Sequence, residues 1–508
     1  MTKLNAALLE KGDFPDKDSV TWNRQLPEKA IQFGQGNFMR GYLDWMLHQM
    51  NKKGLFNGNV VVVQPASTGT VIPKLNEQDG LYTVILRGME NGAVVDKSEV
   101  ITSISRGLNA RQEWHKVLEV AESTDLEFVF SNTTEAGITY VCEDYHEGEV
   151  PESFPGKLTV FLYHRYNALG GDKKTGLTIV PCELVDENGK KLKELVLKKA
   201  EDWKFPGKFA EWIERDNQFC DTLVDRIVTG FPKEAVEEFN KRLGYEDEFI
   251  TLGEPYHMLA IEAPRSVKEK LPFHEAGLNV FWEDIKPHRE LKVRLLNGPH
   301  TMMFSVAFLY GVDTVLEVME NDVLSKFVEL AFSEISPTVL ADEKVKEQFI
   351  EAVKERFLNP YNKHYLTDIG LNAVFKYRAR LLPTLKRYVD LKGELPQAIV
   401  FSLAAMLSYI RPDHEVGGEL VGIRNGVEYA IRDNGVVLEK VTEGWNCVER
   451  DEARVKDFVT SFLSEKEIWG EDLTEIPGLS ETVTENVTMI LKNGMESCVK
   501  KLVGRPLI

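Results

Sequence analysis

The sequence predicts an α/β protein in which an N-terminal Rossmann-type dinucleotide-binding domain precedes a mostly α-helical C-terminal domain. Apolar segments at residues 30–33, 59–63 and 126–130 are short, rich in β-branched or aromatic residues and separated by helical patterns, which is typical of a parallel sheet. After about residue 285, long helical patterns dominate. A chain of 508 residues is too long for one core, so we expect domains at residues 1–286 and 287–508.

The punctuation between these segments predicts further elements. The first 25 residues are polar and predict an arm, whereas a helix should follow the first strand as far as Met50. Asn91-Gly92 predicts a hairpin turn. In the C-terminal domain, Asn425-Gly426 and Asn434-Gly435 predict a β ribbon near residues 420–439. Helices are expected near residues 288–310, 313–334, 343–357, 370–391 and 452–466.

Composition and charge exclude several classes of partner. The formal charge of −19, from 80 acidic and 61 basic residues, repels phosphate backbones, so we expect no nucleic acid partner. The longest apolar run, residues 398–410, is too short to span a bilayer, and the N-terminus lacks the apolar stretch of a signal peptide. Five scattered cysteines without a CxxC pair suit a reducing compartment. We expect a cytoplasmic protein without a membrane partner.

A glycine-rich turn follows the first predicted strand. Gly34 and Gly36 stand between that strand and a helix, where a dinucleotide pyrophosphate needs close backbone approach and free N–H groups. Met39 occupies the place of the usual third glycine, so the motif alone also fits a tight turn without a ligand. The second strand ends at Gln64 rather than at an acidic residue. Gln64 could bind a ribose hydroxyl, but the residues leave NAD and NADP open.

The segment from Lys292 to His300 carries the most chemical information. On a helix, Lys292 falls in the middle of an apolar stripe with Leu296 and Met303, where we expect it to be buried. Desolvation disfavours the charged form of a lysine, which suits proton transfer near neutral pH. Asn297 and His300 lie on one flank and could bind a carbonyl or alkoxide oxygen. The alternative is a lysine at a helix edge beside a structural histidine.

The pattern K-x4-N-x2-H formed by Lys292, Asn297 and His300 resembles the signature of the polyol-specific long-chain dehydrogenases, also called the mannitol dehydrogenase family. The resemblance covers most of the chain. Residues 33–40 are similar to that family's G-x-G-x-F-x-R cofactor turn, and residues 79–82, 131–135 and 224–227 resemble three further family segments. It implies NAD as the cofactor, bound through Phe33, Gly34, Gly36, Asn37, Phe38, Arg40, Gln64, Asn132 and Thr133.

The resemblance also implies a mechanism without a metal. Lys292 would be the general acid and base, while Asn297 and His300 would hold and polarise the reacting oxygen. Lys376 would bind substrate. Mannitol-specific members carry a second asparagine where Leu184 stands here, and the segment around residues 368–372 also departs from their pattern.

The substrate expected from the resemblance is an acidic ketose, that is, a sugar acid. The segment at residues 181–184 and the ribbon are most similar to family members that act on such compounds. Other substrates of the family, fructuronate and mannonate or mannitol and fructose, stay open, as does a non-catalytic nucleotide-binding protein. The basic residues that could bind a carboxylate are Arg40, Arg294, Lys363 and Lys376.

Two other chemistries are not expected. Glu254, His257 and His274 do not have the spacing of a metal site. Cys182 has no histidine partner evident in the sequence, so a buried structural thiol is expected. The sequence does not predict an oligomeric state.

Overall fold

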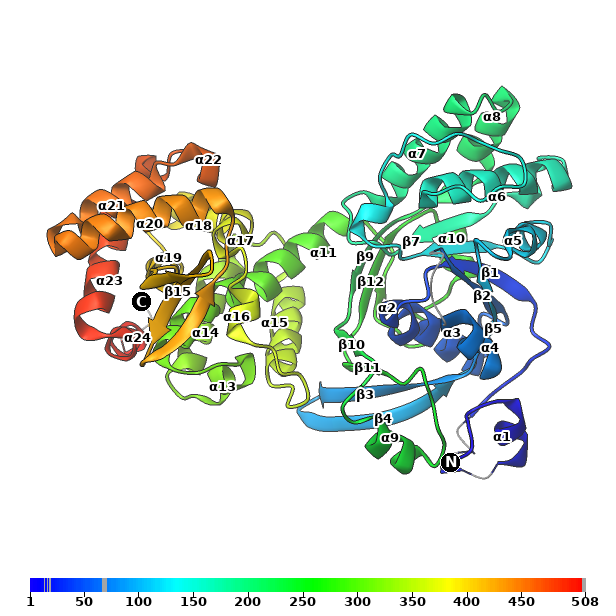
Figure 1. Cartoon of the computed structure of the whole chain (residues 1–508), viewed down its shortest axis with the longest axis horizontal. Coiled ribbons are helices and arrows are strands. Elements are labelled where there is room, and N and C mark those ends of the chain that lie inside the picture. The colour runs from blue at the N-terminus through cyan, green and yellow to red at the C-terminus, as the bar shows by residue number, and fades with distance from the viewer. Residues whose placement is uncertain (13, 16, 18–19, 66–70, 505–508) are drawn as a thin grey trace. The chain divides into compact units, whose positions relative to one another are not determined.

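The computed structural model describes residues 1–12, 14–15, 17, 20–65 and 71–504 and divides the chain into two compact units. Unit 1 is Met1–Ile285 and unit 2 is Lys286–Ile508. Figure 1 shows that unit 1 contains a sheet with helices on its two faces, whereas unit 2 is mainly helical. The predicted fold class is therefore confirmed.

The largest sheet of unit 1 has six parallel strands within the described residues, in the order β5-β2-β1-β6-β7-β8. Numbered by their order along the chain, these strands run 3-2-1-4-5-6, which is the order of a Rossmann sheet. The central strands are almost entirely buried, because helices cover both faces. The strands are β1 (Glu28–Phe33), β2 (Asn59–Gln64), β5 (Ile104–Asn109), β6 (Phe128–Ser131), β7 (Thr178–Pro181) and β8 (Gln218–Phe219).

Each face of this sheet has its own core. Alternate residues of β1 and β2 point to opposite faces: Ala30, Val60 and Val62 pack with α2, α3 and α4, whereas Ile31 and Val61 pack with the helices of the other face. The first group is α2 (Asn37–Gly41), α3 (Leu43–Lys52) and α4 (Val71–Glu77). The second is α5 (Trp114–Ala121), α6 (Phe154–Leu169), α7 (Asn188–Asp202) and α8 (Gly207–Asp216).

Smaller sheets complete unit 1. Strands β3 (Tyr82–Glu90) and β4 (Ala93–Ile101) form the predicted hairpin, and Asn91 and Gly92 both have positive φ at its turn. This hairpin belongs to a sheet of order β10-β11-β3-β4, and a further sheet has the order β13-β12-β9. The other elements are β9 (Asp221–Asp225), β10 (Val228–Gly230), α9 (Val236–Leu243), β11 (Thr251–Gly253), β12 (Met258–Glu262), α10 (Arg265–Lys270) and β13 (Val280–Phe281).

The N-terminal arm predicted from polar composition contains a short helix instead. Helix α1 (Ala6–Lys11) begins at the N-cap Asn5, whose side chain accepts from Leu8 N. Leu4 and Leu8 are buried against Phe239, Leu243 and Ile250. Two apolar side chains are too few to raise the average hydrophobicity of the segment, but they suffice to anchor it.

Unit 2 is built around two apolar helices, α12 (Gly298–Tyr310) and α19 (Gln397–Tyr409), which are buried over most of their length. Buried Glu334 accepts hydrogen bonds from the N–H groups of Ala398 and Ile399 and so caps α19. The surrounding elements are α11 (Ile285–Leu291), α13 (Val315–Glu320), α14 (Leu324–Ile335), α15 (Glu343–Phe357), α16 (Leu366–Ile369), α17 (Ala373–Arg380), α18 (Leu382–Lys392), α20 (Gly435–Arg450), α21 (Val455–Leu463), α22 (Lys466–Trp469), α23 (Leu479–Asn493) and α24 (Met495–Val503).

The β ribbon of unit 2 begins and ends earlier in the sequence than predicted. It consists of β14 (His414–Val416), β15 (Glu419–Arg424) and β16 (Val427–Ile431), and Asn425-Gly426 forms the turn between the last two. The Asn434-Gly435 pair is not a turn of the ribbon. The side chain of Asn434 caps the N-terminus of α20 by accepting from Val436 N, since asparagine serves equally well as a turn residue and as a helix cap.

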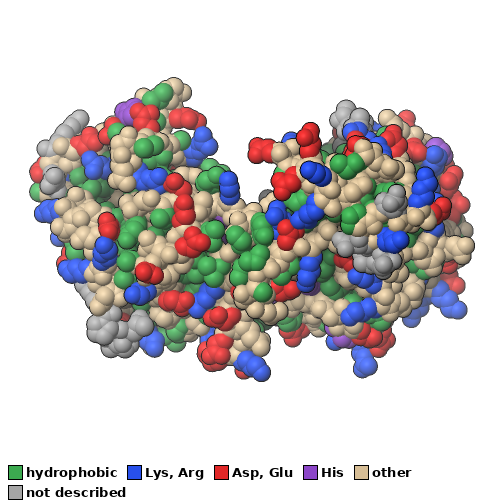
Figure 2. All heavy atoms as spheres, turned by 90° about the horizontal axis from the view of Figure 1, so that it is seen from below, with side chains coloured by type: hydrophobic (Ala, Val, Ile, Leu, Met, Phe, Trp, Pro, Cys, Tyr) green, Lys and Arg blue, Asp and Glu red, His purple; other side chains and the backbone are tan. Residues whose placement is uncertain are grey.

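Figure 2 shows acidic and basic side chains intermixed on the face that it draws. None of the helices in the described part of the chain combines the length and the apolar composition needed to cross a membrane.

Candidate active site

The glycine-rich turn of unit 1 contains two glycines, and the structural reason for a glycine differs between the two positions. Gly34 has φ +118°, and a Cβ there would lie 2.4 Å from the carbonyl oxygen of Asn132. The fold therefore requires glycine at this position. Gly36 has ordinary backbone angles, and among the described residues, apart from its two chain neighbours, no atom lies within 4 Å of where its Cβ would be. It is the N-cap of α2 and makes no side-chain cap bond, so the first turn of that helix is open to a ligand.

The two aromatic residues of the turn differ in exposure. Phe33 is fully buried and contacts Phe154 and Phe161, so its side chain belongs to the core. Phe38 is half-buried and stacks on Tyr42 with ring centroids 4.8 Å apart. Tyr42 also has φ −128° and ψ −85°, which breaks the helix predicted as far as Met50 into α2 and α3.

The side chain of Arg40 stabilises the glycine-rich turn through hydrogen bonds. Its guanidinium donates to the carbonyl oxygen of Gln35, to Asn37 Oδ1 and, over 3.2 Å, to Thr251 Oγ1. Burial lowers the pKa of Arg40, and the ring of Phe249 lies 5.4 Å away. These contacts join the guanidinium of Arg40 to one backbone carbonyl and two side chains, so Arg40 fixes the shape of the turn. Asn37 is exposed.

The ends of β2 and β6 lie beside this turn in the sheet. Gln64 closes β2 and is buried. Residues 66–70, which follow this strand, lie outside the described part of the chain. Asn132 directly follows β6. Its backbone N–H donates to Phe33 O, and its side-chain Nδ2 donates to Cys182 O. Both contacts join neighbouring strands where they end.

A buried carboxylate that the sequence did not reveal organises the same edge. Glu183 accepts from Ser131 Oγ at 3.0 Å and from the N–H and Oγ1 of Thr133 at 2.9 and 3.0 Å. Burial raises its pKa, while these hydrogen bonds oppose the shift. The role of Glu183 could not be recognised from the sequence, because it depends on the proximity of the ends of β6 and β7, which are about 50 residues apart.

In unit 2, Lys292–Asn297 forms a π-helix between α11 and α12. Its end is marked by a hydrogen bond from Gly298 N to Val293 O, which spans five residues. Pro299 lies in the first turn of α12 and has no N–H to donate to the carbonyl four residues earlier, so the α-helical register cannot continue. The helix is therefore distorted at Gly298-Pro299, and single-turn π segments are frequent at functional sites.

The π register changes the positions predicted on a regular helix. In an α-helix, Asn297 would lie about 140° around the axis from Lys292. In a π-helix each backbone hydrogen bond joins residues five apart, which brings the side chains of Lys292 and Asn297 closer to one side of the segment. His300 lies about one α-helical turn farther along. The predicted burial of Lys292 is wrong: Lys292 and Asn297 are half-buried, while Leu295 and Leu296 take the buried face.

His300 is held in an apolar and electropositive setting. Its ring lies 4.4 Å from that of Phe357 and 4.8 Å from that of His364. Burial, followed by the charges of His364, Arg356 and Arg380, lowers the pKa of His300 well below its ordinary value, although a hydrogen bond to the Leu296 backbone opposes this. Nε2 is buried, and no hydrogen-bond partner for it is found among the described residues. His300 is therefore a neutral imidazole with one nitrogen available to a ligand.

Helix α17 carries two basic side chains, and one of them contacts the residue that follows His300. Lys376 is half-buried and donates to Ile369 O at 3.0 Å, and Arg380 donates from Nη1 to Thr301 Oγ1 at 3.1 Å. Among the basic residues proposed from the sequence, Arg294 contacts Thr384 and Glu290, and Lys363 is exposed. Arg380 was not predicted from the sequence, because its position beside Thr301 follows only from the packing of α17 on α12.

Two family models match the chain consecutively. The mannitol dehydrogenase Rossmann domain matches residues 28–275, and the mannitol dehydrogenase C-terminal domain matches residues 284–491. The chain belongs to the mannitol dehydrogenase family. The family resemblance predicted from the sequence is therefore confirmed.

Within the mannitol dehydrogenase family, similar proteins carry the name altronate oxidoreductase. The one from Halalkalibacterium halodurans is 50% identical over 482 residues, which cover 95% of this chain and 94% of the relative. The one from Bacillus subtilis is 43% identical over 479 residues, 94% of this chain and 95% of the relative. The one from Escherichia coli strain HS is 40% identical over 497 residues, 97% of this chain and 99% of the relative.

Two solved structures share the fold of this chain at low sequence identity. Mannitol 2-dehydrogenase of Pseudomonas fluorescens, in a ternary complex with NAD and D-mannitol, has a TM-score of 0.68 at 20% identity, covering 99% of this chain and 100% of that one. Substrate-free D-sorbitol dehydrogenase has a TM-score of 0.78 at 19% identity, covering 98% and 100%.

Other candidate groups have structural roles. Leu184, which replaces the second asparagine of mannitol-specific members, is 61% exposed and cannot donate to an oxygen. Burial raises the pKa of the Cys182 thiol well above its ordinary value, which disfavours the nucleophilic thiolate. Nε2 of His257 accepts from Asn279 N at 3.0 Å. Throughout the part of the chain that the structure describes, no group of three or more His, Cys, Asp and Glu side chains could hold a metal.

Proposed function

We propose that this protein is an NAD-dependent altronate oxidoreductase, which interconverts D-tagaturonate and D-altronate at the keto carbon. The observation that carries the proposal is the 50% identity to an altronate oxidoreductase over 95% of this chain and 94% of the relative. The altronate oxidoreductases of Bacillus subtilis and Escherichia coli match over a similar span. The matched region includes the C-terminal domain, which contains the proposed catalytic group.

The turn after β1 fits the pyrophosphate of NAD. The open space at Gly36 allows a phosphate to approach the backbone, and the first N–H groups of α2 suit a negative charge. Phe33, Gly34, Asn37, Phe38 and Arg40 would shape this turn, while Gln64, Asn132 and Thr133 would bind at the neighbouring strand ends. When bound, the nicotinamide accepts or supplies the hydride of the reaction.

Lys292 is the proposed general acid and base. In the reductive direction its ammonium group donates the proton that the carbonyl oxygen gains, and in the oxidative direction its neutral amine takes the hydroxyl proton. Asn297 would donate from its side-chain amide to the same oxygen and stabilise the charge that develops there. The π-helix supports this assignment, because it brings Lys292 and Asn297 towards one side of the segment.

His300 would act as a neutral hydrogen-bonding group. Its depressed pKa keeps the imidazole uncharged, and the bond to the Leu296 carbonyl occupies its protonated nitrogen. Nε2 then carries a lone pair and accepts a hydrogen bond, so we assign it to a hydroxyl group of the substrate rather than to the keto oxygen. This proposed role differs from the sequence-based expectation, in which His300 holds and polarises the reacting oxygen.

The proposal is tested by identifying the product. The protein is incubated with D-tagaturonate and NADH, and the product is compared by chromatography with authentic D-altronate and with its epimer at the new carbinol carbon. We expect altronate, in an amount equal to the NADH consumed. Formation of the epimer, or consumption of NADH without altronate, contradicts the proposed function.

A further inference from the structure

The candidate catalytic turn is connected to a cation on the neighbouring helix. The hydroxyl of Thr301 donates to the carbonyl oxygen of Asn297 at 2.8 Å and accepts from Nη1 of Arg380 at 3.1 Å. Thr301 is buried and directly follows His300. Arg380 thus contacts the residue that follows His300 and is linked to the backbone of Asn297 by two hydrogen bonds through the Thr301 hydroxyl.

A second cation lies on the same face of this helix. Lys376 precedes Arg380 by four residues in α17, which places the two side chains one above the other. Both are half-buried. Burial and the charge of Arg380 lower the pKa of Lys376, and burial lowers that of Arg380. Two like charges at this spacing repel one another, and partial desolvation strengthens the repulsion.

The described residues offer these cations little compensation. No ion pair is formed by Lys376 or Arg380 within the described ranges, and their printed hydrogen bonds go to neutral oxygens, Ile369 O and Thr301 Oγ1. Asp368 and Asp433 favour the charged form of Lys376 at longer range, and Asp433 Oδ2 accepts from Val374 N. An anionic ligand beside Arg380 would relieve the repulsion that these groups leave.

We propose that Arg380, together with Lys376, binds the carboxylate of the sugar acid and thereby selects acidic ketoses over neutral ones. The inference rests on the proposed function and identifies the group that recognises the substrate class. A guanidinium presents parallel N–H donors that match the two oxygens of a carboxylate. The carboxylate of a ketonic sugar acid is several bonds from its keto carbon, so its binding group should lie beside the oxygen-binding residues rather than among them.

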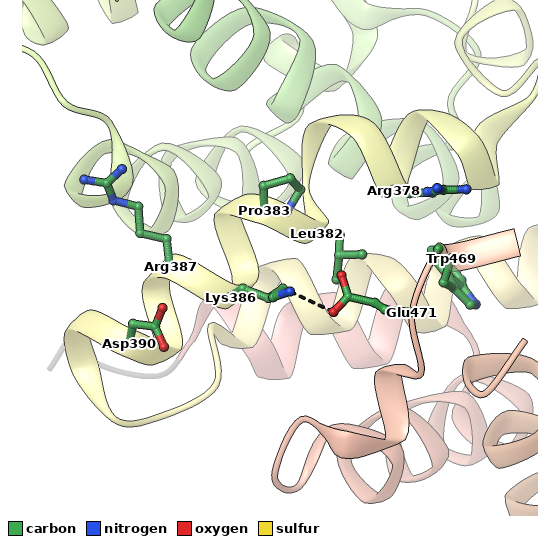
Figure 3. A pocket seen from close by; sticks show the side chains of 9 residues that line it. Arg378, Leu382, Pro383, Lys386, Arg387, Asp390, Trp469 and Glu471 are labelled. Carbon is green, nitrogen blue, oxygen red and sulfur yellow. Dashed lines mark hydrogen bonds and ion pairs between the residues drawn. The ribbon is translucent and has the colours of Figure 1, made fainter. Parts of the chain in front are cut away.

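The neighbouring arginine of the same helix provides a matched control. Arg378 donates from Nη1 to Ile468 O at 2.9 Å and lines a cavity of 660 Å³ with Lys386 and Glu471, which pair at 2.7 Å. Figure 3 shows these side chains around that cavity, together with Trp469. Arg378 and Arg380 therefore share an element, a charge and a residue type but contact different parts of unit 2.

The test compares Arg380→Gln, Arg380→Lys and Arg378→Gln with the wild type. Initial rates of NADH oxidation are measured with tagaturonate and fructuronate as acidic ketoses and with fructose and tagatose as neutral ones. Melting temperature and the Kd for NADH are recorded for each variant as controls of folding. Glutamine at position 380 can still donate to Thr301, so the hydrogen-bonded chain to Asn297 is disturbed as little as possible.

We expect Arg380→Gln to lower the ratio of kcat/KM for acidic over neutral ketoses by about 100-fold, since a hydrogen-bonded charge pair is lost. Arg380→Lys should recover part of that ratio, and Arg378→Gln should leave it within about threefold of the wild type. An equal loss for both substrate classes, or no loss, overturns the inference. If the wild type reduces fructuronate but not tagaturonate, only the proposed function is wrong. If it reduces neutral ketoses alone, both are wrong.

Discussion

Replacement of Gly36 by valine should abolish tight NADH binding without unfolding the protein. In the part of the chain that the structure describes, no atom beyond its two chain neighbours lies within 4 Å of the position that a Cβ would take. The backbone angles of Gly36, φ −64° and ψ 162°, are open to any residue. The branched side chain would therefore occupy the space that the pyrophosphate needs. The variant separates ligand binding from folding, which a substitution of Gly34 would not do.

The size of the effect follows from the contacts that would be lost. Hydrogen bonds to a charged group are worth about 1.5–3 kcal/mol each, so losing two from the first turn of α2 costs about 3–6 kcal/mol. This corresponds to a Kd for NADH that is raised by about two to four orders of magnitude. Fluorescence titration with NADH measures the Kd, and thermal melting shows whether the variant is folded.

Gly34→Ala is the contrasting control. Its Cβ would lie 2.4 Å from Asn132 O, at a backbone conformation with φ +118°, so we expect a large drop in melting temperature or failure to fold. If folded Gly36→Val binds NADH as tightly as the wild type, the phosphates do not lie at this turn and the cofactor assignment is refuted.

Other properties follow from the same structure. Lys292→Ala should lower kcat by several orders of magnitude while leaving the Kd for NADH near normal, and a variant that keeps more than a few per cent of the wild-type rate would remove Lys292 from the mechanism. Reduction by the wild type should slow as pH rises and oxidation should slow as pH falls, which rate profiles in both directions test. Dialysis against a strong chelator should leave the rate unchanged, whereas a loss restored by zinc would disprove a metal-independent reaction. Burial raises the pKa of Asp44 to about 7, so its folded state holds a proton that the unfolded state has released between about pH 4 and pH 7. That contribution to the free energy of unfolding is lost as pH rises through this window, and it can reach about 4 kcal/mol. Urea titrations at several pH values should therefore show a weaker pH dependence of the free energy of unfolding for Asp44→Asn than for the wild type. An unchanged dependence would refute this assignment.

Local patterns predicted the elements whose character is set by their own residues. The strand at Asn59–Gln64 is buried at every position, and its run of valines makes that visible in the sequence. The hairpin turn at Asn91-Gly92 was equally predictable, because positive φ at both turn positions favours these residue types. Elements of this kind placed the glycine-rich turn correctly at the end of β1.

Features that depend on hydrogen-bond register or on distant contacts were not predictable. The periodicity of residues 288–310 gives one regular helix, whereas Pro299 shifts the register to π and changes the side on which Asn297 lies. Arg380 and Thr301 are 79 residues apart, and Ser131 and Glu183 are 52 apart. Residue type and spacing hold no information about such pairs, so the carboxylate-binding arginine and the buried glutamate emerge only from the packing.

The central claim is most directly tested by comparing substrates with the unmodified protein. Oxidation of NADH is followed at 340 nm, with D-tagaturonate, D-fructuronate and D-fructose presented in parallel at matched concentrations. We expect the highest kcat/KM for tagaturonate, by about tenfold or more over fructuronate, because one misplaced hydroxyl costs roughly 1–3 kcal/mol in a site with built-in hydrogen bonds. A higher kcat/KM for fructuronate or for fructose would contradict it.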